Sequence, residues 1–240
     1  MNRRISAIVA AMAARLEAQD KQRRDLMADI AHELRTPLTV MQGQLEGIVD
    51  GVYPRDDARL NDVLGQARLL GRLVEDLRTL ANAERGTLAL KKEPTDLRAL
   101  VEDATAAFAA EAAAKHVTIA ISAHEELPPI EIDPLRIREV LINLLSNALR
   151  HSADGGSVTI TIASRGDSLA VGVRDTGAGI PPDILPRIFD RFYKGPASQG
   201  SGLGLTIARN FVEAHGGQIA TESRVGEGTC ITFTLPRGAA

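Results

Sequence analysis

The chain has 240 residues and a mass of 25.6 kDa, and its 44% of hydrophobic residues can fill the core of one large domain or two small ones. A net charge of −3 and a pI near 6.0 argue against nucleic acid as a partner, and the absence of tryptophan argues against stacking on bases. A single cysteine, Cys230, rules out an internal disulfide and fits a reducing cytoplasm, and no apolar run approaches the roughly 20 residues that cross a bilayer.

The first 50 residues predict one long amphipathic helix. Residues 1–25 contain neither Gly nor Pro, and a helical spacing of apolar residues continues to Ile48. Pro37 lacks an amide donor, so we expect a local kink there. His32 and Glu33 lie beside the apolar stripe and should face solvent. An exposed imidazole next to a carboxylate is a phosphoacceptor arrangement if a nucleotide is delivered to it.

A turn is predicted at residues 51–56, where Asp56 or Asp57 is suited to cap a second helix from about Ala58 to about Glu84. The two helices form a hairpin whose apolar stripes exceed what the pair can cover. We therefore expect a homodimer in which two hairpins form a four-helix bundle. The alternative is that the stripes pack onto the C-terminal part of the chain.

After residue 85 the pattern becomes mixed. The elements predicted there are, in order, an extended linker at 88–94, a helix at 97–114, strands at 117–122 and 130–132, a helix from Asp133-Pro134 to about Arg150, strands at 158–163 and 169–174, a loop-rich region at 175–200, a helix at 203–215, and a hairpin of 218–223 with 229–235. Strict β-α-β alternation is absent, so we expect an α+β sandwich with helices on one face of a mixed sheet. The alternation in the last strand predicts that Cys230 points inward.

The helix that ends near Arg150 places Glu139, Asn143 and Asn147 four residues apart, and hence on one face. Asparagine carbonyl oxygens suit a Mg²⁺ ion that water and phosphate mostly hold. The alternative interpretation is an ordinary exposed polar face.

Two glycine-rich stretches flank a loop with basic residues. In 175–180, the carboxylate of Asp175 can accept a hydrogen bond from an exocyclic amine such as that of adenine, and the glycines let the backbone approach a ligand; a plain strand-ending turn is the alternative. The stretch 200–205 opens a helix, where backbone amides bind phosphate, although such helix starts are common. Residues 181–199, which include Arg191 and Lys194, predict a lid whose basic side chains reach phosphates.

Taken together and in this order, these motifs resemble those of the cytoplasmic core of bacterial sensor histidine kinases, over about residues 20–236. The matching boxes are the phosphoacceptor box at 32–37, the N box at 143–147, the first glycine box at 175–179, the F box at 188–193 and the second glycine box at 200–204. The resemblance implies a signalling-helix end at 1–20, a dimerisation and histidine phosphotransfer domain at 21–86, a linker at 87–96, and an ATP-binding domain of the GHKL type at 97–240.

The resemblance also implies roles for individual residues. His32 is the nucleophile, Glu33 accepts or orients its proton, and Thr36 orients water for dephosphorylating a response regulator. An ordinary surface role remains open for Glu33, and so does a bond from Thr36 back to a helix carbonyl. Mg²⁺ is held by Asn147 and, as a second ligand, Asn143. The implied nucleotide-contacting residues are Asn143, Asn147, Arg150, His151, Asp175, Gly177, Gly179, Ile180, Arg191, Phe192, Tyr193, Lys194, Gly200, Gly202, Leu203, Gly204, Leu205 and Thr229.

The expected function is autophosphorylation of His32 from Mg-ATP, followed by transfer to an aspartate of a response regulator, which the protein also dephosphorylates. Asn143 is an amide that cannot take a proton from water, so transfer should dominate over hydrolysis, although Glu139 stays open as a base. Two other classes of protein remain open, a GHKL ATPase in which His32 is incidental and a nonhydrolytic dimeric scaffold. We expect a cytoplasmic location, as part of an inner-membrane sensor of which this chain is a fragment; Met1 as a native start is the alternative.

Overall fold

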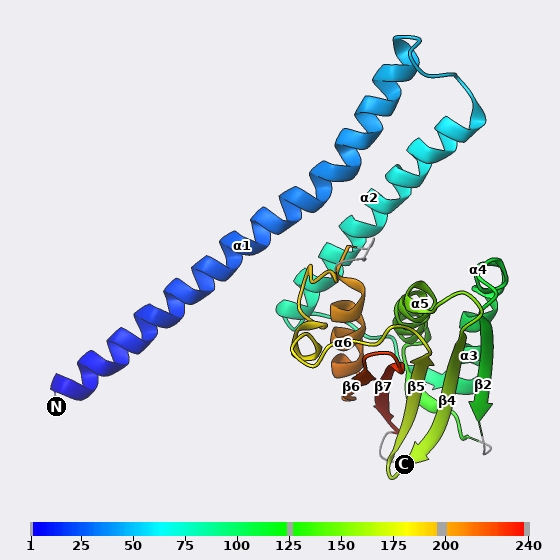
Figure 1. The fold of residues 1–240 in the computed structure, drawn as a ribbon. Helices are drawn as coiled ribbons and strands as arrows, with labels where there is room; N and C mark the ends of the chain where they lie inside the picture. The colour runs from blue at the N-terminus through cyan, green and yellow to red at the C-terminus, as the bar shows by residue number, and fades with distance from the viewer. Residues whose placement is uncertain (1, 124–126, 196–200, 238–240) are drawn as a thin grey trace. The chain divides into compact units, whose positions relative to one another are not determined.

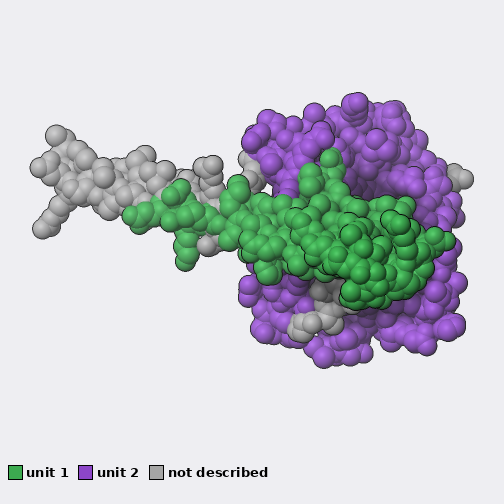
Figure 2. Space-filling model, turned by 90° about the horizontal axis from the view of Figure 1, so that it is seen from above, with its two compact units in different colours: residues 1–75 green, residues 76–240 purple. Residues whose placement is uncertain are grey.

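The protein is described from a computed structural model that covers residues 2–123, 127–195 and 201–237. The chain divides into two compact units, residues 1–75 and 76–240 (Figure 2). The order of helices and strands along the chain is shown in Figure 1. No helix in the described ranges is both long enough and apolar enough to cross a bilayer.

The first unit consists of α1 (Asn2–Val49) and most of α2 (Asp57–Glu84). As expected, α1 runs through the His32 segment without a break, and it continues past the buried Pro37. Gly51, at a φ of 73°, ends the helix in a left-handed conformation that glycine adopts without strain. Asp56 is the residue that caps α2, because its Oδ1 accepts from the backbone N–H of Arg59 at 2.9 Å.

Apolar side chains remain exposed along both helices of this unit. They include Leu38, Leu45, Val49, Leu60 and Leu64, and Val49 is 80% exposed. Burial of apolar surface is the main favourable term in association. The hairpin in a single chain therefore leaves much of its apolar stripe uncovered.

The second unit is a two-layer sandwich. Its five-stranded sheet has the order β2-β4-β5-β7-β6, and only the pair of β2 and β4 is parallel. The strands are β2 (Thr118–Ala123), β4 (Ser157–Arg165), β5 (Ser168–Asp175), β6 (Ile219–Arg224) and β7 (Gly228–Pro236). Helices α3 (Leu97–Ala106), α5 (Pro134–His151) and α6 (Gly204–Ala214) pack together on one face of this sheet (Figure 1). The prediction of an α+β sandwich with a mixed sheet is confirmed.

Alternation along the strands creates the core of the sandwich. Ile160 on β4 lies opposite Val173 on β5, and Val171 on β5 lies opposite Phe233 on β7. These side chains are buried beneath the apolar face of α5, which includes the fully buried Leu141 and Leu145.

The prediction that Cys230 points into this core is wrong. Cys230 is only partly buried, whereas its neighbour Ile231 is 4% exposed and Phe233 is fully buried. Successive side chains of a strand point to opposite faces. The larger residues Ile231, Phe233 and Leu235 occupy the helix side, so Cys230 lies with Thr232 on the open face of the sheet.

Two further predictions need correction. The expected linker at 88–94 leads into a short strand, β1 (Glu93–Thr95), which pairs with β3 (Ile130–Ile132) in a separate two-stranded sheet. The single helix expected at 97–114 is divided into α3 and α4 (Ala109–Ala114). No Gly or Pro lies at the break, so the sequence carried no signal for it.

A buried histidine supports the start of α5. The backbone N–H of Asp133 donates to Nε2 of His215 at 3.0 Å, and Nδ1 of His215 donates to the carbonyl of Phe211 at 2.7 Å. The carboxylate of Asp133 in turn caps α5 by accepting from the N–H groups of Leu135 and Arg136. Because Nε2 must accept, the imidazole is neutral in the folded protein.

Stability of the second unit should therefore fall in acid. Burial lowers the pKa of His215 below its usual range, and the charge of Lys92 acts in the same direction. Below a pH of about 6.5 the unfolded chain then binds more protons at His215 than the folded chain does. The free energy of unfolding therefore falls by up to about 1.4 kcal/mol per pH unit. The free energy of opening of α5, obtained from hydrogen exchange of its amides between pH 5.5 and 7.5, measures this loss of stability. His215→Gln should flatten the pH dependence, and the control His116→Gln should not.

Candidate functional site

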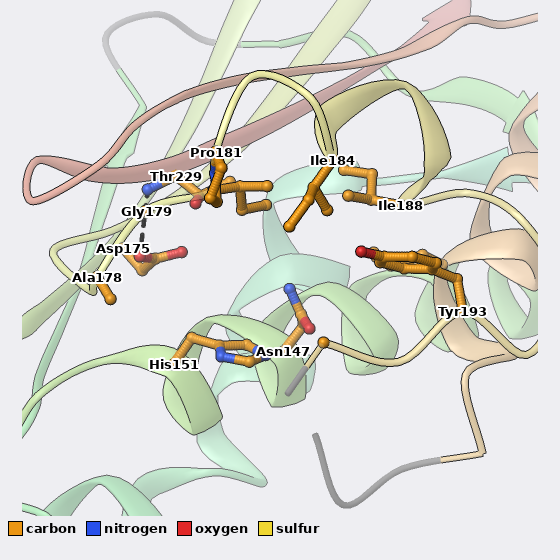
Figure 3. A pocket seen from close by; sticks show the side chains of 13 residues that line it. Asn147, His151, Asp175, Ala178, Gly179, Pro181, Ile184, Ile188, Tyr193 and Thr229 are labelled. Atoms are coloured by element: carbon orange, nitrogen blue, oxygen red, sulfur yellow. Dashed lines mark hydrogen bonds between the residues drawn. The ribbon is translucent and has the colours of Figure 1, made fainter. Parts of the chain in front are cut away.

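A cavity of about 260 Å³ lies in the second unit, between the C-terminal half of α5, the loop after β5 and the start of β7. It is lined by Asn147, His151, Asp175, Ala178, Gly179, Ile180, Pro181, Ile184, Ile188, Tyr193, Gly195, Leu205 and Thr229. Figure 3 shows the side chains of Asn147, Ile184, Ile188 and Tyr193 around one space, with Asp175 at one end of it. The wall is mostly apolar with a few polar groups, which is typical of sites for small organic ligands.

Asp175 is the central polar group of this cavity. It ends β5 and is only 4% exposed. Its Oδ1 accepts from the backbone N–H of Gly177 at 2.8 Å. It also accepts from the backbone N–H of Thr229 at 3.2 Å (Figure 3). A carboxylate with one oxygen held in this way can offer the other to a donor on a ligand, such as an exocyclic amine.

The glycines after Asp175 are required by close packing. A Cβ on Gly177 would lie 2.2 Å from the carbonyl oxygen of His151. Gly179 has a φ of 71°, and a Cβ there would lie 2.0 Å from the carbonyl oxygen of Arg224. The first contact places the turn against the end of α5, and the second places it against the hairpin of β6 and β7.

Asn147 and His151 lie one turn apart on α5, and both line the cavity (Figure 3). Asn143 lies one turn earlier, outside the lining, with its Oδ1 next to the start of α6 at Gly204. Glu139 pairs with Arg136, whose Nη1 lies 3.2 Å from its Oε2. The expected polar face of this helix is therefore split, because only Asn147 and His151 reach the cavity.

Two ionisable groups of the lining, Asp175 and His151, affect each other. Burial raises the pKa of Asp175, although hydrogen bonds from Gly177 and Thr229 and the nearby His151 oppose the shift. Partial burial of the ring lowers the pKa of His151, and the charge of Arg150 acts in the same direction. A lowered pKa keeps this imidazole neutral at physiological pH, so it can accept a hydrogen bond from a ligand as well as donate one.

Several other predicted ligand contacts lie outside the described lining. These are Asn143, Arg150, Gly177, Arg191, Phe192, Lys194, Gly202, Leu203 and Gly204. Leu203 is fully buried and Arg150 is exposed, whereas Phe192 has a φ of 56°, which is uncommon for a residue with a side chain. Gly200 lies outside the residues that the structure describes.

Five lining residues were not among the ligand contacts predicted from the sequence, although Ala178 and Ile188 lie within the first glycine box and the F box. Ala178, Pro181, Ile184, Ile188 and Gly195 all lie in the segment that was interpreted as a loop and lid. Ile184 and Ile188 flank a short 3₁₀ helix, η1 (Leu185–Arg187), and their spacing of four residues was the available signal.

The predicted phosphoacceptor group lies in the first unit, on α1. His32 is exposed, as expected from its place beside the apolar stripe, and Glu33 is partly buried. The hydroxyl of Thr36 donates to the carbonyl of His32 at 3.2 Å, which is the back-bonding that the sequence left open.

Comparisons with known proteins match both parts of the chain. The model of the His Kinase A (phospho-acceptor) domain matches residues 22–86, and that of the histidine kinase-, DNA gyrase B- and HSP90-like ATPase matches residues 132–239. The signal transduction histidine-protein kinase BaeS of Escherichia coli K12 is 38% identical over 94% of this chain and 49% of its own length. The sensor protein SrrB of Staphylococcus aureus is 34% identical over 91% of this chain and 39% of its own length.

The solved structure of the histidine kinase AdeS of Acinetobacter baumannii is similar to this one, with a TM-score of 0.76 and 32% identity. The match covers 87% of this chain and 98% of that chain. This chain spans about half the length of BaeS and less of SrrB.

The geometry predicts that Gly179→Ala will be much more damaging than Gly166→Ala. Both glycines have a positive φ, but a Cβ on Gly166 has no atom within 4 Å, whereas one on Gly179 overlaps the carbonyl of Arg224. We expect Gly166→Ala to cost about 1 kcal/mol of unfolding free energy from φ alone. Gly179→Ala should cost about 2–5 kcal/mol, since overlap adds to the same strain. Equal costs in urea unfolding would contradict the packing described for this turn.

Proposed function

This chain belongs to the histidine kinase family, and we propose that it transfers the γ-phosphoryl group of ATP to His32 and then passes it to an aspartate of a response regulator. Family membership confirms the resemblance that the motifs indicated. The observation that carries the proposal is that one chain holds an exposed histidine in a matched phosphoacceptor domain and a cavity built around Asp175 in a matched ATPase domain.

The adenine of ATP is proposed to bind at Asp175, where the carboxylate accepts from its amine and Thr229 lies alongside. Asn147 projects into the cavity, so its amide oxygen is suited to hold Mg²⁺ together with phosphate and water. Asn143 is proposed as the second ligand, and Arg150, Arg191 and Lys194 as phosphate contacts. When bound, Mg²⁺ supplies charge neutralisation of the phosphates.

In the proposed reaction, a ring nitrogen of neutral His32 attacks the γ-phosphorus of ATP. A nitrogen–phosphorus bond forms as the bond to the β,γ-bridging oxygen breaks, and ADP leaves. Glu33 accepts or orients the proton on the other ring nitrogen. Hydrolysis is disfavoured because Asn143 is an amide and Glu139 is engaged by Arg136. The phosphohistidine then gives up its phosphoryl group to the regulator.

The protein is proposed to act as a homodimer. The uncovered apolar side chains of the first unit, Leu38, Leu45, Leu60 and Leu64 among them, support pairing of two hairpins into a four-helix bundle. Within this arrangement residues 21–86 would form the dimerisation and phosphotransfer domain, 87–96 the linker and 97–240 the ATP-binding domain. We propose that the chain is the cytoplasmic part of a longer, membrane-attached sensor, as its partial coverage of BaeS and SrrB suggests.

Incubation with γ-labelled Mg-ATP tests the kinase proposal. We expect an acid-labile, alkali-stable label on the protein, because a phosphohistidine has this stability. His32→Gln should abolish the label, and His116→Gln, which changes an exposed histidine outside the proposed site, should retain it. Asp175→Asn should weaken ATP binding roughly tenfold or more, because an amide presents a donor to the adenine amine, and labelling should fall with it. Bound ATP without any label would contradict the proposal.

Thr36 is predicted to serve the removal of phosphate from the regulator. Thr36→Ala should slow regulator dephosphorylation roughly ten- to a hundredfold, because the water it orients loses its partner, while labelling of His32 persists. Thr39→Ala is the matched control, since Thr39 is also exposed and lies three residues further along α1. Loss of both activities in Thr36→Ala would indicate that the hydroxyl supports the helix through the carbonyl of His32.

A further inference from the structure

Ser223 on β6 is outside the cavity lining but bonds to two residues of it, Ile180 and Thr229, and to Gly228 next to Thr229. Its Oγ accepts from the backbone N–H of Ile180 at 2.8 Å and donates to the carbonyl of Gly228 at 2.9 Å. The same oxygen lies 2.8 Å from Oγ1 of Thr229, which lines the cavity. The hydroxyl of Ser223 thus joins the glycine-rich turn after β5 to the start of β7.

The single proton of the Ser223 hydroxyl determines the direction of these hydrogen bonds. A serine hydroxyl has one proton and two lone pairs. The proton goes to the carbonyl of Gly228, since otherwise two acceptors would face each other at 2.9 Å, and one lone pair receives the N–H of Ile180. The remaining lone pair must receive the proton of Thr229, so Thr229 donates to Ser223.

Thr229 then has only lone pairs left for a ligand. Asp175 is beside it, held by the N–H of Thr229, and a carboxylate also only accepts. The end of the cavity at Asp175 and Thr229 therefore presents two acceptors and favours a donor, such as the 6-amino group of a purine or a water that it binds. A 6-oxo group would face acceptors on both residues.

We infer that Ser223 is a positioning residue: by taking the proton of Thr229 it holds that hydroxyl as an acceptor and makes the base site select 6-amino over 6-oxo purines. This inference rests on the proposed nucleotide site. Ser223 thus takes part in selecting the base although it lies outside the cavity lining.

The test compares binding of ADP and inosine diphosphate to the unchanged chain and to Ser223→Ala by titration calorimetry. Without Ser223 the hydroxyl of Thr229 can rotate and donate to a 6-oxo group. The preference for ADP should therefore fall roughly three- to tenfold, the size of one hydrogen bond. Ser223→Thr keeps a hydroxyl and should keep the preference.

Two further variants separate this role from a merely structural one. Thr221→Val removes a hydroxyl two residues earlier on β6, which is buried and has no hydrogen-bond partner among the described residues, so both affinities should stay unchanged. Thr229→Val should lower the preference by itself, and adding Ser223→Ala to it should lower the preference no further.

Equal weakening of both nucleotides in Ser223→Ala, with the preference unchanged, would overturn the inference and leave the proposed function standing. Additive losses of preference when Thr229→Val and Ser223→Ala are combined would also overturn the inference and leave the proposed function standing. Failure of the unchanged chain to bind either nucleotide would overturn the proposed function, and the inference with it.

Discussion

The cavity of the second unit is built around one buried carboxylate, that of Asp175. An ionisable group in the interior is unfavourable unless hydrogen bonds replace its water. The N–H groups of Gly177 and Thr229 do so, and they come from the turn after β5 and from β7. These strands are neighbours in the sheet, with Arg174 opposite Cys230, although more than fifty residues separate them along the chain. The order of strands is thus what allows the carboxylate to be buried.

Glycine serves this arrangement by allowing backbone to approach backbone. A Cβ on Gly228 would lie 2.0 Å from the carbonyl oxygen of Asp175, and one on Gly177 would lie 2.2 Å from that of His151. The sequence interpretation assigned the glycines after Asp175 to the approach of a ligand. In the structure Gly177 and Gly179 mainly admit other parts of the protein, namely the end of α5 and the hairpin of β6 and β7. Ser223 reinforces the same junction by bonding to Ile180 and Gly228.

The longest periodic segments were predicted best. The helices α1, α2 and α5 and the strands β4 and β5 lie within a few residues of their expected ranges, because each buries a regular apolar face. The predictions that were wrong concern short segments whose structure is set by the segments packed against them. Residues 93–95 form a strand because β3 is available to pair with them, and Cys230 faces outward because Ile231 and Phe233 take the buried side. The roles assigned to individual site residues stay predictions.

The sequence by itself determined the classes of structure and chemistry: an amphipathic hairpin bearing His32, a sandwich with a mixed sheet, and the family to which the chain belongs. These follow from local periodicity and from motifs that lie within a few residues of each other. Only the tertiary structure decided which motif residues share one cavity. Asn147 and His151 reach it but Asn143 does not, although all three lie on α5, and Ile184 and Ile188 complete its wall. The physical reason is that a cavity is formed by side chains from distant segments, and the packing of α5, α6 and the sheet sets which of them face it.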